Sequence, residues 1–217
     1  MATYIDVVNN VLRRLREPTV LSVDDTPYSS MIGVLVNDAK REVEDANEWN
    51  VLSSTVTVNT VANTYNYTLT GAGTRFRVID VMNDTTNVFV NYAPTHWMNQ
   101  QFLFTDSTDT GVPLYYNFNG VDSNGDTQVD LLKRPDGVYT LRFNLVIPQE
   151  TLSSDTTRIL VPDHLVAMLA YAKAIAERGE DGGNLSSEAY ALYKNSLANE
   201  IAIERNRYPD EMNWVAP

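Results

Sequence analysis

The spacing of apolar residues changes twice along this chain of 217 residues. Up to about residue 50, apolar side chains recur every three or four residues, which is the period of an amphipathic helix. From about residue 51 to residue 160 they alternate with polar ones, which is the period of a strand with one buried face. The helical period returns after Val161. This order predicts two helices, then a β-region, then two more helices.

The helices are bounded by recognisable start and stop signals. The first two are expected over about residues 4–15 and 27–49, with Thr26 as the N-cap of the second. The last two are expected over about residues 163–178 and 186–208. The third is rich in alanine, and small side chains on several faces let neighbouring helices approach closely.

About seven short strands are expected between the helices, which favours a sandwich or a barrel. Residues 56–58 and 65–69 form a hairpin pattern, and residues 76–82 and 88–92 form a second pair. A short helix around Trp97 interrupts the strands.

A helix with one apolar stripe cannot bury it alone, so the simplest arrangement packs all four helices together. The predicted fold is therefore α+β, a four-helix bundle with an inserted antiparallel β-sandwich or barrel. The expected domains are a helical bundle of residues 1–50 and 161–207, an inserted β-domain of residues 51–160, and a C-terminal arm of residues 208–217.

The formal net charge of −12 is spread over the whole chain. A protein that grips nucleic acid needs a basic stripe to release phosphate counterions, and the sequence has none. The apolar runs are too short to span a membrane. The chain has no cysteine, which excludes disulfides and thiolate metal sites and fits a reducing cytoplasm.

The sequence contains no recognisable catalytic motif, so we expect no enzyme and no cofactor. His164 is interpreted as a neutral surface side chain in the first turn of a helix, and His96 as part of a packed loop beside Trp97. Three aspartates near an Asn-Gly turn are a weaker metal alternative to a simple hairpin turn: Asp122, Asp126 and Asp130.

Two segments are candidates for contacts with other proteins. The charged run at residues 38–48 is either a solvated helix face or a seam between subunits. The candidates for contacts between subunits are Asp38, Arg41, Glu42, Asp45, Glu48, Ala167, Ala170 and Ala174. The aromatic C-terminal segment is expected to dock on a neighbour, with folding back on its own helices as the alternative. The arm candidates are Arg207, Tyr208, Met212, Trp214 and Val215.

The layout of the chain resembles the tail tubular protein A family, the head-to-tail adaptors of short-tailed bacteriophages. The similarity lies in the order of the elements and in several short stretches. These are residues 5–15, 39–49, 64–69, 111–115, 135–140 and 161–165. The resemblance extends over nearly the whole chain, although each stretch has low specificity.

The resemblance implies a structural virion protein that forms a ring of about twelve copies between portal and tail nozzle. It implies that genomic DNA passes through the ring without specific binding, that tail fibres are further partners, and that the protein is made in the cytoplasm of the bacterial host. It places subunit contacts on residues 39–49 and 165–178, and portal contacts on the arm. Two other functions stay open from the residues alone. One is a carbohydrate-binding β-module of a tail or receptor-binding protein, and the other is a glycan-cleaving enzyme that uses carboxylates.

Overall fold

The computed structural model describes residues 1–104, 109–179 and 182–207. The chain forms two compact units. The helical unit contains residues 1–52 and the described part of residues 149–217. The β-unit contains the described part of residues 53–148.

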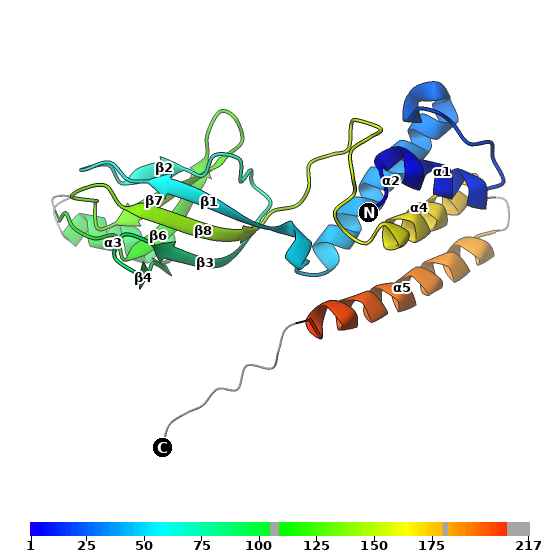
Figure 1. Ribbon diagram of the computed structural model, residues 1–217. Coiled ribbons are helices and arrows are strands. Elements are labelled where there is room, and N and C mark those ends of the chain that lie inside the picture. The colour runs from blue at the N-terminus through cyan, green and yellow to red at the C-terminus, as the bar shows by residue number, and fades with distance from the viewer. Residues whose placement is uncertain (105–108, 180–181, 208–217) are drawn as a thin grey trace, which may run out of the picture. The chain divides into compact units, whose positions relative to one another are not determined.

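Helix α4 (Asp163–Arg178) is the centre of the helical unit. It packs against α1 (Tyr4–Arg14), α2 (Pro27–Ala46) and α5 (Asn184–Arg205). In Figure 1, α5 runs alongside α4, and α1 and α2 lie on the other side of α4. Two 3-10 turns complete the unit, η1 (Val23–Asp25) and η2 (Asn50–Leu52).

Local signals in the sequence set the helix ends. Thr3 and Asp6 form a capping box at the start of α1, and Thr26 accepts a hydrogen bond from the backbone N–H of Ser29 at the start of α2. Gly179 ends α4 with a φ of 64°, a left-handed conformation that favours glycine. The predicted start of the second helix at Thr26 is confirmed.

The α+β class is confirmed, but the predicted four-helix bundle is wrong. The described residues form five helices and two four-stranded sheets, and helix α3 (Thr95–Phe104) belongs to the β-unit. Within the helical unit, α5 buries only Tyr193, Leu197 and Glu204, so it covers α4 without joining a shared four-helix core. The physical reason is that α4 buries side chains on several faces, which lets it pack against three helices.

The β-unit consists of two sheets with the orders β1-β8-β3-β4 and β2-β7-β6-β5. The strands are β1 (Ser53–Asn59), β2 (Asn66–Thr68), β3 (Arg77–Asn83), β4 (Val88–Phe89), β5 (Asn91–Tyr92), β6 (Tyr115–Val121), β7 (Thr127–Leu132) and β8 (Thr140–Val146). All pairs are antiparallel except β5 with β6, which is parallel. The predicted purely antiparallel arrangement is therefore wrong at one edge.

The two sheets share one apolar core. Leu141, Phe143 and Leu145 alternate along β8 and are fully buried, and the ring of Phe143 meets that of Tyr116 on β6 at 5.9 Å. The predicted hairpin of residues 56–58 with 65–69 is wrong, because β1 pairs with β8 and β2 pairs with β7. The second predicted pair, residues 76–82 with 88–92, is confirmed for β3 with β4, but residues 91–92 form β5 and pair with β6.

Residues 149–152, which follow the β-unit in the chain, are held against α2 by polar contacts. The Lys40 ammonium donates hydrogen bonds to the carbonyls of Gln149 at 2.6 Å and Glu150 at 3.0 Å, and it pairs with Glu44 at 3.2 Å. The Asn37 side chain donates to the carbonyl of Leu152 and accepts from its N–H. These bonds satisfy backbone groups that no sheet or helix satisfies.

Candidate functional site

The outward face of α2 carries a row of charged side chains. Asp38, Arg41, Glu42 and Asp45 are exposed, and Glu48 is exposed just beyond the end of the helix. They face outward because the apolar stripe on the opposite side of α2 is buried, with Ile32, Val36, Ala39 and Val43 at zero exposure. All five charged candidates therefore lie at the surface, where a second protein can reach them.

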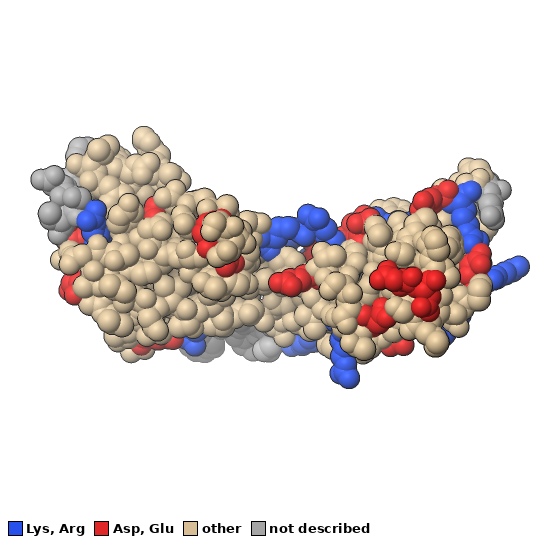
Figure 2. All heavy atoms as spheres, turned by 90° about the horizontal axis from the view of Figure 1, so that it is seen from above, with Lys and Arg blue, Asp and Glu red and all other residues tan. Residues whose placement is uncertain are grey.

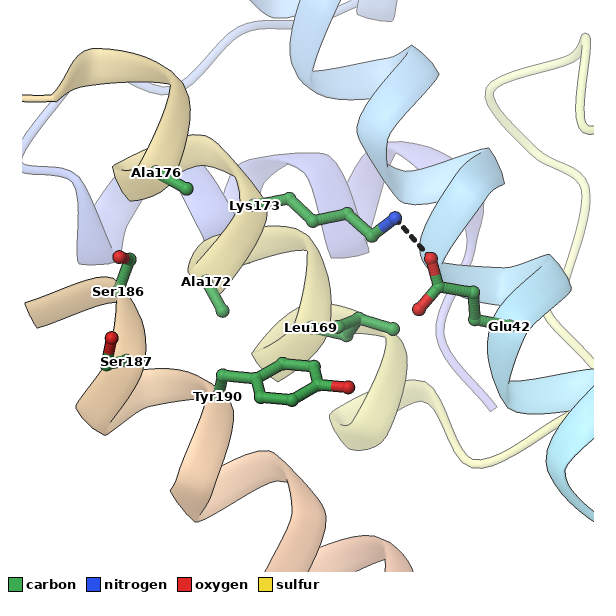
Figure 3. Close-up of a pocket in the computed structure, with 8 residues that line it drawn as sticks. All are labelled: Glu42, Leu169, Ala172, Lys173, Ala176, Ser186, Ser187 and Tyr190. Atoms are coloured by element: carbon green, nitrogen blue, oxygen red, sulfur yellow. Dashed lines mark hydrogen bonds and ion pairs between the residues drawn. The ribbon is translucent and has the colours of Figure 1, made fainter. Parts of the chain in front are cut away.

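A pocket of about 430 Å³ opens beside this charged row, between α2, α4 and α5 (Figure 3). The residues that line it are Glu42, Leu169, Ala172, Lys173, Ala176, Ser186, Ser187 and Tyr190. Lys173 pairs with Glu42 across the pocket at 2.5 Å. The pocket therefore combines apolar and small side chains from α4 with a charged edge from α2.

Tyr193 lies one turn after Tyr190 on α5, and their rings meet at 5.8 Å. Burial raises the pKa of the Tyr193 phenol to about 12, and the negative charge of Glu42 adds to the shift. The phenol is therefore neutral over the physiological range. It is a buried side chain near the middle of α5 and has no acid or base role near pH 7.

The alanine candidates are placed differently from the charged ones. Ala167, Ala170 and Ala174 are buried inside the helical unit, with exposed fractions of 1%, 0% and 0%. Their small size serves the close packing of α4 within one copy of the chain. They are not at a surface that a second copy can reach in this structure.

Helix α5 presents an apolar ridge to solvent, formed by Leu185, Leu192 and Ile203. These side chains are 54%, 54% and 59% exposed. Steps of 7 and 11 residues place them on one side of the helix, because both are near multiples of 3.6. An exposed apolar ridge on a long helix is typical of a surface that packs against another protein.

Only one of the predicted arm residues lies in the described part of the chain. Arg207 follows the end of α5, and its guanidinium pairs with Glu204 at 3.5 Å. The arm candidates Tyr208, Met212, Trp214 and Val215 lie outside the described residues.

Sequence reasoning missed a second surface, the corner between α1 and α2. Leu21 is 95% exposed, the largest exposure among the apolar side chains identified as exposed. Arg13, Arg14 and Arg16 are exposed next to this corner. The sequence did contain a signal for this surface. Leu21 is a large apolar residue between the helix stop at Pro18 and the helix start at Thr26, and it belongs to the apolar stripe of neither predicted helix.

The carbohydrate-binding alternative concerns the aromatic residues of the β-unit, and the structure shows Trp97 packed against a neighbouring ring. Trp97 on α3 is half-buried, and its ring meets that of Tyr115 edge-on at 4.8 Å. His96 is exposed beside it. The arrangement favours local packing for Trp97, whereas the exposure of His96 does not fit the predicted packed position.

The three aspartates near the Asn-Gly turn bind protein donors. Asp122 accepts from the N–H groups of Asn124 and Asp126, and Asp126 accepts from the N–H groups of Gly71 and Gly73. Asp130 accepts from the side chains of Asn66 and Asn119. Over residues 1–104, 109–179 and 182–207 there is no group of three His, Asp or Glu that could hold a metal ion. The three aspartates therefore organise loops and strands.

Charge on the helical unit is grouped by sign. Figure 2 shows acidic side chains gathered on one face of this unit, with basic side chains at its edge. His164 on α4 lies 3.4 Å from Glu200 on α5. No helix in the described part of the chain is both long and apolar enough to span a membrane. Of these features, the exposed apolar ridge of α5 is the one typical of a surface that contacts another protein.

Comparison with known protein families identifies the family of the chain. The family model "SU10 adaptor protein" matches residues 2–214, so the chain belongs to the SU10 adaptor protein family. It is a structural adaptor protein of a bacteriophage, located in the virion, and it interacts with other virion components. A search of curated proteins found no match.

Proposed function

We propose that this chain is a head-to-tail adaptor of the tail tubular protein A type. In this proposal about twelve copies form a ring between the portal and the tail nozzle, and the genomic DNA passes through the ring without specific binding. Tail fibres are further candidate partners on the β-unit. The chain acts by binding proteins and needs neither a cofactor nor a membrane.

The surface of the helical unit is the observation that supports this function best. One copy leaves the charged row of α2, the α5 ridge and the pocket uncovered. Exposed surfaces on more than one helix of a compact unit suit a subunit that contacts neighbouring proteins. Membership of an adaptor family supports the same conclusion.

The acidic surplus suits a channel wall that lets DNA slide. A net charge of −12 per copy repels phosphates on average, and a strong grip would hinder passage. We therefore expect no retention of duplex DNA by the assembled ring near physiological salt.

Electron microscopy of the purified chain, alone and mixed with the portal protein encoded beside its gene, tests the proposal. We expect monomers or small oligomers alone and rings attached to the portal in the mixture. Absence of rings together with absence of portal binding would contradict the proposal. A glycan array serves as the control for the carbohydrate-binding alternative, because an adaptor should bind no glycan on it.

The arm is tested separately by deleting residues 208–217. We expect the thermal transition to change little while portal attachment is lost. The control replaces the arm with a Gly-Ser segment of the same length. A large drop in melting temperature after deletion would instead assign the arm to the core of the helical unit.

A further inference from the structure

Two asparagines of the β-unit are followed directly by glycine in the sequence. Asn119 lies at a register shift in β6, and Asn124 lies in the turn between β6 and β7. In such a pair the asparagine side chain can react with the backbone nitrogen of the next residue, because glycine has no side chain to block the approach. Both asparagines are exposed, so exposure alone does not distinguish them.

The side chain of Asn119 is held by protein. Its amide donates to the carboxylate of Asp130 at 2.9 Å, and Asn66 donates to the other oxygen of that carboxylate at 2.7 Å. Strand β6 is also paired with β7 on both sides of Asn119, through Phe118 and Val121. A reaction at Asn119 would have to break the side-chain hydrogen bond and move paired backbone, which costs free energy. The structure therefore protects this asparagine.

Asn124 combines a fixed backbone with an unbonded side chain. The Asp122 carboxylate accepts from the N–H groups of Asn124 at 2.8 Å and Asp126 at 2.9 Å. Within the described part of the chain, the Asn124 side chain forms no hydrogen bond. The N–H of Gly125 donates to the carbonyl of Asp122 at 3.2 Å, which is at the long end of the normal range. This long bond in a surface turn is the one that must open before the Gly125 nitrogen can react.

We propose that Asn124 is a site of spontaneous deamidation in the folded protein. Asparagine is one of the chemically labile residues of proteins. The Gly125 nitrogen attacks Cγ of Asn124, so a bond forms between these two atoms and the Cγ–Nδ2 bond breaks. The proton from the Gly125 nitrogen leaves with the side-chain amide as ammonia, and the product is a succinimide ring. A water molecule from solvent then opens the ring, giving aspartate or isoaspartate according to the carbonyl that it attacks.

The modification acts on contacts that hold a neighbouring loop. The Asp126 carboxylate accepts from the N–H groups of Gly71 at 3.0 Å and Gly73 at 3.1 Å, and its own N–H is held by Asp122. In isoaspartate the main chain runs through the former side chain and gains a carbon atom, which changes the spacing of the turn. The new carboxylate also lies beside two others, and like charges repel. Deamidation should therefore loosen residues 71–73, and this effect does not depend on the proposed ring.

Peptide mapping by mass spectrometry tests the site. The purified chain is incubated at mildly alkaline pH, once folded and once in concentrated guanidinium chloride. In denaturant, Asn119 and Asn124 should deamidate at similar rates, because each is followed by glycine and neither is held. In the folded protein Asn124 should react several-fold faster than Asn119. Equal rates in the folded protein, or no reaction at Asn124, would overturn the inference.

Substitutions test the structural reason for the difference. Asn124→Gln should abolish the modification at this position, because glutamine would have to form a larger ring. The matched control, Asn119→Gln, should leave the rate at Asn124 unchanged. Asp130→Ala frees the Asn119 amide and should raise its rate toward that of Asn124, with thermal unfolding used to verify the fold. A folded Asp130→Ala chain in which Asn119 stays unreactive would contradict the protective role of this hydrogen bond.

Hydrogen exchange measures the effect on the loop. The modified chain carries an additional negative charge, so ion-exchange chromatography separates it from the original one. The N–H groups of Gly71 and Gly73 should exchange several-fold faster in the isoaspartate form. The control is freshly prepared Asn124→Asp, which adds the same charge without the additional carbon atom and should change the exchange less. Unchanged exchange in the isoaspartate form would contradict the predicted loosening.

Discussion

The buried pair of Lys40 and Glu44 should be one of the most sensitive positions in the helical unit. Their side chains are 3% and 1% exposed, and the ammonium also donates to the carbonyls of Gln149 and Glu150. Lys40→Met removes the positive charge beside the buried Glu44 carboxylate and the donor that both carbonyls share. Breaking a buried ion pair from one side typically costs about 3–5 kcal/mol. We expect the free energy of unfolding of the helical unit to fall by that amount.

A double substitution separates buried charge from lost packing. Lys40→Met with Glu44→Leu removes both charges, so it should recover at least about 1 kcal/mol of the loss. Recovery should be incomplete, because the backbone groups of Gln149 and Glu150 still lack partners, at about 1–3 kcal/mol for each unsatisfied group. The matched control is Lys173→Met. Its ion pair with Glu42 is partly exposed, at 28% for Lys173 and 51% for Glu42, and breaking it should cost less than about 1 kcal/mol.

The assay must report the helical unit alone, because a chain with two units need not unfold in one step. Trp49 is suitable, since its side chain is 2% exposed and its indole N–H donates to the carbonyl of Val43 at 2.7 Å. Urea unfolding followed by Trp49 fluorescence, in a background with Trp97→Phe and Trp214→Phe, gives the free energy. A loss below about 1 kcal/mol for Lys40→Met would refute the reasoning.

Three further predictions test the packing and ionisation of the helical unit. Gly33→Ala should destabilise the helical unit by about 1–3 kcal/mol in urea unfolding, because the added Cβ would lie 2.5 Å from the Tyr4 hydroxyl oxygen. The control is Gly137→Ala, which should be close to neutral because its added Cβ has no atom within 4 Å. Stability should fall as pH rises from about 10 through about 12, because the folded state raises the pKa of Tyr193 and the unfolded chain loses that proton first. Tyr193→Phe should flatten this dependence, and an equal slope in both proteins would contradict it. Thr3→Ala should cost about 1 kcal/mol by removing the α1 cap, while Thr3→Ser should retain most of the stability in thermal unfolding.

Local signals were sufficient for the helices and for their ends. Thr26 and Pro27 start α2, Gly179 ends α4, and each signal acts through backbone groups only a few residues away. Such interactions need no knowledge of the rest of the chain. The outward orientation of Asp38 and Glu42 also follows from the period of α2. Their role in subunit contacts stays a prediction.

Strand pairing was predicted well only where the turn was short. The pair of β3 with β4 is close in sequence, whereas β1 pairs with β8 across more than 80 residues. Alternation shows which side chains of a strand face the core, but it does not identify the neighbouring strand. That choice depends on how the faces of both sheets pack together.

The sequence by itself determined the order of the elements, the α+β class and the ends of the main helices, because periodicity and capping are local properties of the chain. Only the tertiary structure decided that α5 covers α4 without forming a four-helix core, that the three predicted interface alanines are buried, and that Leu21 projects almost fully into solvent. These features depend on which surfaces remain uncovered after packing. Exposure is a property of the whole fold, so no single segment of the sequence contains it.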